Sequence, residues 1–185
     1  MPSKRDNRSS DEVTQKRRRR RASKKDIEVL ATLLVAYPQV SRATFDPERK
    51  TLGLVFLCRG PVGKKRRTDL ERIYKDSVEV YLSLIGRKPG YLASSWEQMD
   101  RFCSFQVERD VATLTPGELN MTVDLVCSHV DVVSAIDGST CVEDPEFSWS
   151  ARAFLKEVLD KVQDLESPRK LVALREGEKV LVFDK

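Results

Sequence analysis

The sequence predicts an α+β fold, with a small antiparallel sheet of about four strands packed against about five helices and a disordered basic arm in front. Three observations support this prediction. The chain has 185 residues, of which 40% are hydrophobic, and this is enough to build one core. Several stretches carry apolar residues at helical spacing, and two pairs of β-rich runs are each joined by a polar turn. The first 23 residues contain almost nothing to bury.

The basic arm is residues 1–23, and residues 24–185 form the expected single globular domain. A segment as polar as the arm cannot offset the entropy that it loses on ordering. Residues 1–25 hold 11 basic and 3 acidic residues and carry +8, whereas residues 26–185 carry −4. The formal net charge of +4 therefore combines a polycationic arm with a slightly acidic domain. This distribution excludes a uniformly basic, histone-like protein.

The domain is expected to begin with a helix and a hairpin. Ser23 is placed to cap the helix, and Pro38 ends it. Two β-rich runs follow at residues 40–45 and 52–58, and the second is apolar on both faces, which is typical of a central strand. The expected buried face of the helix is Ile27, Leu30, Ala31, Leu34 and Val35.

A second helix is predicted after a basic loop at residues 59–67. Thr68 and Glu71 have the spacing of a capping box, so the helix is expected to start at Thr68. Gly86 suits its C-terminal end. The expected buried face is Leu70, Ile73, Tyr74, Tyr81, Leu84 and Ile85.

Residues 95–114 fit two patterns. Apolar residues recur at three- and four-residue steps, as on a helix, but Phe105, Val107 and Val111 also alternate with polar residues, as on a strand. The length of the segment favours the helix. A following helix would make residues 95–134 an αα-hairpin.

That following helix has clear start signals. Thr115 and Glu118 have capping-box spacing, and Pro116 suits the first helical position. Its expected packed seam is Leu119, Val123, Val126, Val130 and Val133.

The end of the domain repeats the order of helix and hairpin. Asp137–Thr140 reads as a turn, a helix should run from about Ser150 to Pro168, and a closing hairpin should span residues 170–183. The hairpins at 40–58 and 170–183 are expected to share one sheet. The inward residues of the last helix are expected to be Phe154, Leu155, Val158, Leu159, Val162 and Leu165.

Two clusters of cations carry the main functional signal, one in the arm and one in the loop before the second helix. A flexible polycation gains affinity for a polyanion by releasing condensed counterions, and backbone amides at a helix start attract phosphate. The sequence therefore predicts a non-enzymatic protein associated with nucleic acid or ribonucleoprotein, with RNA favoured over DNA. The predicted contacts to the phosphate backbone are Lys16, Arg17, Arg18, Arg19, Arg20, Arg21, Lys24, Lys25, Lys64, Lys65, Arg66 and Arg67.

An alternative prediction is a protein-interaction or regulatory subunit. Segment 91–185 holds 10 cations and 18 acids, so this acidic, largely helical half would dock a partner while the arm acts as tether or localisation signal. Ser23 follows an arginine run, as in substrates of basophilic kinases, and is a candidate phosphorylation site.

No catalytic, metal or cofactor motif stands out in the sequence. His129 is the only histidine, and it would share a face with Cys127 and Asp131 only on a strand, where the spacing predicts a helix. The four cysteines include no CxxC pair, so reduced thiols are expected. No apolar run reaches the ~18–20 residues that span a bilayer, and no secretory signal is seen. We expect a cytoplasmic protein, or a nuclear one in a eukaryote.

Overall fold

The computed structural model describes residues 24–133, 156–164, 169–177 and 179–184. Predictions made for the arm, including Lys16 to Arg21 and Ser23, lie outside the described residues, as do those for Asp137–Thr140 and for Ser150 to Leu155. Residues 156–163 are helical. The other elements are α2 (Lys24–Ala36), β1 (Arg42–Asp46), β2 (Thr51–Arg59), α3 (Lys64–Leu84), β3 (Leu92–Gln98), β4 (Phe102–Asp110), α4 (Pro116–His129), β5 (Leu171–Glu176) and β6 (Lys179–Asp184).

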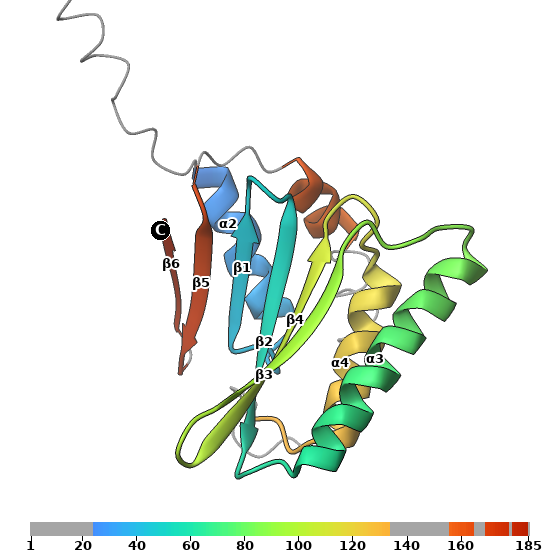
Figure 1. Ribbon diagram of the computed structural model, residues 1–185. Coiled ribbons are helices and arrows are strands. Elements are labelled where there is room, and N and C mark those ends of the chain that lie inside the picture. Colours follow the sequence, from blue (N-terminus) through green and yellow to red (C-terminus); the bar gives the residue numbers. More distant parts are fainter. Residues whose placement is uncertain (1–23, 134–155, 165–168, 178, 185) are drawn as a thin grey trace, which may run out of the picture.

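Six strands form one antiparallel sheet in the order β3-β4-β2-β1-β5-β6. The helices lie on one face of it: α2 packs on β1, β5 and β6, while α3 lies against β3 and α4 (Figure 1). The predicted α+β class and the shared sheet of the two outer hairpins are confirmed. The predicted count of about four strands is wrong because a third hairpin, β3–β4, completes the sheet. The described residues hold four helical segments, where about five helices were expected.

The third hairpin replaces the helix expected over residues 95–114, so the predicted αα-hairpin at 95–134 is wrong in its first half. β4 lies between β3 and β2, and ladders on both sides satisfy its backbone. Cys103, Phe105 and Val107 face the core, while Gln106 and Glu108 face the other side. Of the two patterns in this segment, the alternation of apolar and polar residues gives the correct structure, because both ladders hold the segment in an extended conformation.

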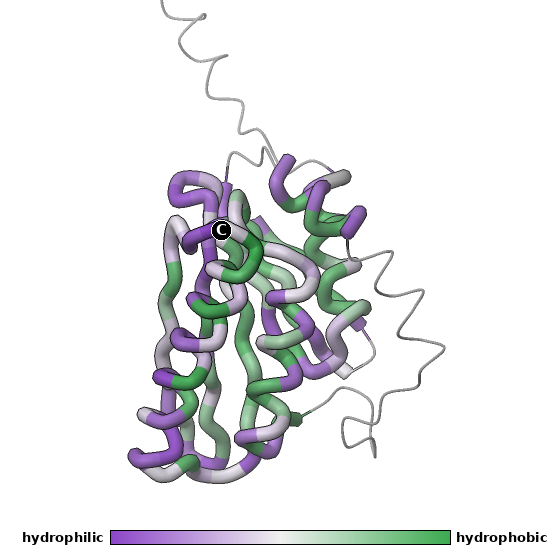
Figure 2. The backbone as a smooth tube through the Cα atoms, turned by 90° about the vertical axis from the view of Figure 1, so that its right-hand side faces the viewer, coloured by the Kyte–Doolittle hydropathy of each residue, from purple (hydrophilic) through white to green (hydrophobic). Residues whose placement is uncertain are grey.

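The core fills the space between the sheet and the helices. On α2 the buried residues include Leu30 and Leu34, as predicted, together with Val29 and Leu33. The buried stripe of α3 repeats every four residues and is Leu70, Tyr74, Val78 and Leu82. Figure 2 shows hydrophilic and hydrophobic residues alternating along α3. In the last helix Val158, Leu159 and Val162 are buried, as expected.

Four residues predicted as buried are exposed. Ile27 and Val35 point away from the sheet-facing side of α2, with 37% and 62% of their surface exposed. On α3, Leu84 follows Leu82 by two residues and so lies on the opposite side of the helix, while Ile85 is the C-terminal cap. Both buried faces were predicted from the spacing of apolar residues alone. Which side of each helix is buried depends on how the helix packs against the sheet.

The two predicted capping boxes have different outcomes. α4 begins as expected, because Thr115 accepts a hydrogen bond from the Glu118 N–H and Pro116 occupies the first turn. α3 instead begins at Lys64, four residues before the expected start at Thr68. Its cap is Gly63, which provides no side-chain bond, and the Thr68 hydroxyl donates to the Lys64 carbonyl from inside the helix.

The opposite face of the sheet carries no helix among the described residues (Figure 1). We call it the open face, and it presents alternate residues of the strands because their neighbours point into the core. None of the described helices has the length and apolarity that a bilayer crossing requires. Residues on the open face include Arg42, Thr44, Asp46, Gly53, Val55, Phe102, Gln106, Glu108, Val172, Leu174, Leu181 and Phe183.

Candidate nucleic-acid interface

The chain brings three segments together where β2 ends. After Arg59, Gly60 takes a positive φ of 68°, which a glycine tolerates and which turns the chain out of the sheet. The Gly60 N–H then donates to the carbonyl of Arg101, 3.2 Å away, in the turn between β3 and β4. α3 begins four residues later at Lys64. The end of β2, the β3–β4 turn and the start of α3 therefore lie side by side.

This arrangement collects cations that are exposed and whose side chains make no hydrogen bond or ion pair among the described residues. Two acids share the region: Asp100 precedes one of the cations in the chain, and the carbonyl of Asp131 accepts the Arg59 N–H at 2.8 Å. The cations outnumber these acids, so the local charge is positive. We call this cluster the basic end, and its members are Arg59, Lys64, Lys65, Arg66 and Arg101.

The position of Lys64, Lys65 and Arg66 is unfavourable for the helix itself. They occupy the first turn of α3, which contains no acid and has no side-chain cap. A helix start carries a partial positive charge, and a cation placed there costs about 0.3–1 kcal/mol at low ionic strength. The free N–H groups of that turn add to the same positive field. An anion bound at this point would relieve both effects.

Arg67 differs from its three neighbours because it is anchored. Its Nε donates to the Val62 carbonyl at 2.7 Å, and its Nη2 donates to Gln98. Its guanidinium also lies 5.8 Å from the ring centre of Trp96. Arg67 therefore ties the start of α3 to β3, while the other three cations remain free.

Two of the five members of the basic end, Arg59 and Arg101, were not among the contacts predicted from the sequence. Arg59 lies directly opposite Phe102 in the sheet register, and Phe102 is 42% exposed. Arg101 reaches the same place only because residues 99–101 are a hairpin turn, a segment that was expected to be helical. The signal that pointed to it was the two-residue alternation of Phe105 and Val107.

The arm cluster and the loop cluster do not meet within the described residues. α2, whose first residue is Lys24, begins at the far end of the sheet from the start of α3 (Figure 1). The Lys24 side chain pairs with Glu28 at 3.8 Å on the surface. The side chain of Lys25 and the whole run from Lys16 to Arg21 lie outside the described residues. Lys24 is the one member of the arm cluster whose side chain the structure describes, and it lies apart from the loop cluster.

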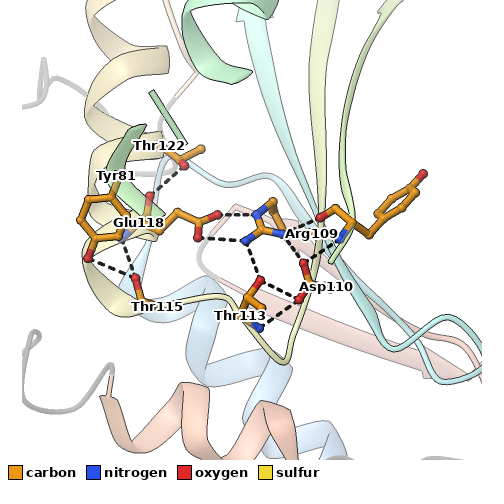
Figure 3. A network of polar contacts seen from close by, with 8 residues as sticks. Tyr81, Arg109, Asp110, Thr113, Thr115, Glu118 and Thr122 are labelled. Carbon is orange, nitrogen blue, oxygen red and sulfur yellow. Dashed lines mark hydrogen bonds and ion pairs between the residues drawn. The ribbon is translucent and has the colours of Figure 1, made fainter. Parts of the chain in front are cut away.

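A second set of charged side chains is buried between β4 and α4 (Figure 3). Arg109 donates to both carboxylate oxygens of Glu118, at 2.5 and 3.1 Å, and also bonds to Asp110. Only 3% of Arg109 and none of Glu118 is exposed. Because solvent and substrate cannot reach this pair, we interpret it as a structural contact that fixes α4 on the sheet.

Burial affects all three groups of this network. Burial alone would lower the pKa of Arg109, but its bonds to Glu118 and Asp110 raise it, so the guanidinium stays charged. Burial raises the pKa of Glu118, which makes this carboxylate costly to bury. For Asp110, burial is outweighed by hydrogen bonds from Thr113, the Tyr91 N–H and Arg109, and its pKa is lowered.

The cysteines and the histidine form no nucleophilic site among the described residues. Cys58 lies directly opposite Cys103 on the core side of the sheet, and burial raises the pKa of Cys58 to about 12. This thiol is therefore protonated at neutral pH. Cys127 and His129 belong to α4, and His129 Nδ1 lies 2.8 Å from the Leu125 carbonyl. The described residues hold no group of three His, Cys, Asp or Glu side chains arranged for a metal ion.

Comparison with models of protein families, with curated proteins and with solved structures finds no match to this chain.

Proposed function

We propose that this protein binds the phosphate backbone of RNA through the basic end, with the arm as a second, flexible contact. The observation that carries the proposal is the first turn of α3. Three free cations stand there at the positive end of a helix, where they oppose helix stability and have no partner among the described residues. A row of phosphates would pair with these side chains and with the free N–H groups of the same turn.

The surroundings of the basic end favour a single strand over a duplex. Phe102 lies on the open face directly opposite Arg59 and is 42% exposed, and a base stacks on an aromatic ring without regard to the identity of the base. Arg59, directly opposite Phe102, extends the positive charge onto the sheet. We expect binding with weak sequence preference, because backbone contacts position a nucleic acid but do not read it.

The test compares two variants with the same change of charge. Lys64→Gln/Lys65→Gln/Arg66→Gln removes three cations from the start of α3, and Lys75→Gln/Arg87→Gln/Lys88→Gln removes three exposed cations from farther along the helix and beyond its end. Affinity for a fluorescent 20-nucleotide oligouridine is measured by anisotropy between 50 and 200 mM salt. Each lost phosphate contact should reduce the slope of log K against log salt by about 0.7.

The first variant should lower the salt slope by about 2, and the control variant should change it far less. Deletion of residues 1–23 should weaken binding further without removing the effect of the first variant. Equal affinities for the two triple variants would refute the role of the basic end. Binding that persists undiminished in 0.5 M salt would refute phosphate contact altogether and favour the alternative, a protein-docking subunit.

A further inference from the structure

The open face contains a groove that is independent of the basic end. Its volume is about 780 Å³, within the ~300–1,000 Å³ range of small-molecule sites. β1 supplies the middle of its floor: Ala43 and Phe45 are fully buried on the helix side, so Arg42, Thr44 and Asp46 face the groove. The groove crosses the whole open face, from Ala93–Ser95 on the edge strand β3 to Phe183 and Asp184 on the edge strand β6, and the central strands β1 and β2 form its middle.

Gly53 makes the floor of the groove hollow. It pairs with Thr44 on one side and with Glu108 on the other, so its missing side chain would project between them onto the open face. A Cβ built on Gly53 would meet nothing closer than 3.8 Å. The chain therefore has room for a side chain here and carries none. The space is open to a ligand.

The cations around the groove differ in whether they have an acidic partner. Two of its cations are neutralised, because Arg49 pairs with Glu108 at 3.1 Å and Lys170 pairs with Asp46 at 3.6 Å. Arg42 is different: the residue is half-buried and its side chain makes no hydrogen bond or ion pair among the described residues.

The setting of Arg42 is apolar. The register places it directly between Val55 on β2 and Leu174 on β5, with no acid opposite. A guanidinium that is partly removed from water without a carboxylate partner is costly, and an anion from outside would satisfy it.

We infer that this groove binds a small organic anion, with its carboxylate or phosphate on Arg42 and an apolar body over Gly53. Arg42 and Gly53 are diagonal neighbours on adjacent strands, about 7 Å apart, which is the span of a fused aromatic ring pair. The planar fork of the guanidinium matches the two oxygens of either anionic group. The Thr44 hydroxyl, opposite Gly53, offers one more polar contact to the body.

The groove fits a molecule with one charge better than a polyanion or a peptide. Asp46 and Glu108 stand along its walls and would repel a chain of phosphates, whereas a single anionic group at Arg42 stays clear of both ion pairs. An extended peptide adds to a sheet by pairing with an edge strand, whereas Arg42 and Gly53 lie on β1 and β2, whose ladders are already paired on both sides.

The experiment titrates the full chain with three probes of one shape: 1-naphthoate, 1-naphthyl phosphate and the neutral 1-naphthalenemethanol. Calorimetry gives the affinity, and ¹H–¹⁵N spectra report the Arg42 side chain and the Gly53 amide. We expect at least one of the anions to bind at least tenfold more tightly than the neutral probe, with both signals shifted. The preferred anion identifies the group that the site takes.

Three variants locate the site, and dispersed spectra verify that each is folded. Arg42→Gln should weaken the preferred anion about tenfold or more, since a charged hydrogen-bond partner is lost. Arg42→Lys should keep the charge and lose part of the affinity, because it lacks the fork. Gly53→Val should abolish binding by filling the hollow, and Lys75→Gln on the helical side should leave it unchanged. Equal binding of the neutral probe, or an Arg42→Gln variant with wild-type affinity, would overturn the inference.

Discussion

Arginine side chains are used in three ways in this structure, and the differences follow from their partners. Arg109 is buried and satisfied by two carboxylates. Arg67 and Arg175 act as clamps between elements: the second donates to the Leu34 carbonyl near the end of α2, a helix without a basic residue in its own last turn. Arg42 has no partner among the described residues, which is why it carries the ligand inference.

Asp110 provides a test of the buried network. Its pKa is lowered in the folded state, whereas an unfolded aspartate titrates near 3.9. The stability that it contributes is therefore fully present above about pH 4 and is lost as the pH falls through the lowered folded value. Urea unfolding between pH 2.5 and 7 should show a decline below pH 4 that is shallower in Asp110→Asn. Parallel curves for the two proteins would contradict the assignment.

At the level of the elements, α4 depends on its first turn. Thr115 caps the helix through its bond to the Glu118 N–H, and its hydroxyl also donates to Tyr81 on α3. Thr115→Ala should lower the free energy of unfolding by about 1 kcal/mol, because one N–H of the first turn then lacks a partner. Thr115→Ser keeps the hydroxyl and serves as the control. Chemical denaturation measures both, and an equal loss in the two variants would argue against capping.

The elements that sequence predicted well are those with local signals. Thr115 and Pro116 specified the start of α4 because capping involves only neighbouring residues. The β3–β4 hairpin was missed because its helical and extended patterns were both present, and only pairing with β2 decides between them. Arg59 and Arg101 come together through that same pairing, so these two of the five members of the basic end could be assigned to it only from the fold. Arg42 gave no signal, since an unpaired cation is recognised only once its neighbours are known.

At the scale of the whole molecule, β1 joins two halves of the sheet. It pairs with β2 on one side and with β5 on the other, and α2 packs across the second junction. Leu171→Ala, in the buried start of β5, should therefore destabilise the entire domain by about 2–5 kcal/mol. Leu181→Ala on β6, where 38% of the side chain is exposed, should cost less than about 1 kcal/mol.

Thermal unfolding followed by circular dichroism measures both leucine variants. We expect one cooperative transition that moves to lower temperature in Leu171→Ala and scarcely moves in Leu181→Ala. A separate early transition in Leu171→Ala, with the rest of the sheet intact, would show that the β5–β6 hairpin unfolds independently.

The pairing of β1 with β5 also has a consequence for biosynthesis. Leu174 follows its partner Arg42 by about 130 residues in the chain. At a synthesis rate of roughly 5–20 residues per second, β1 leaves the ribosome about 7 to 26 seconds before β5 does. Throughout that interval one edge of β1 and the apolar underside of α2 lack their cover, which is the condition for edge-to-edge aggregation. The nascent chain is thus most in need of a chaperone between these two strands, and slow translation there should lower the yield of folded protein.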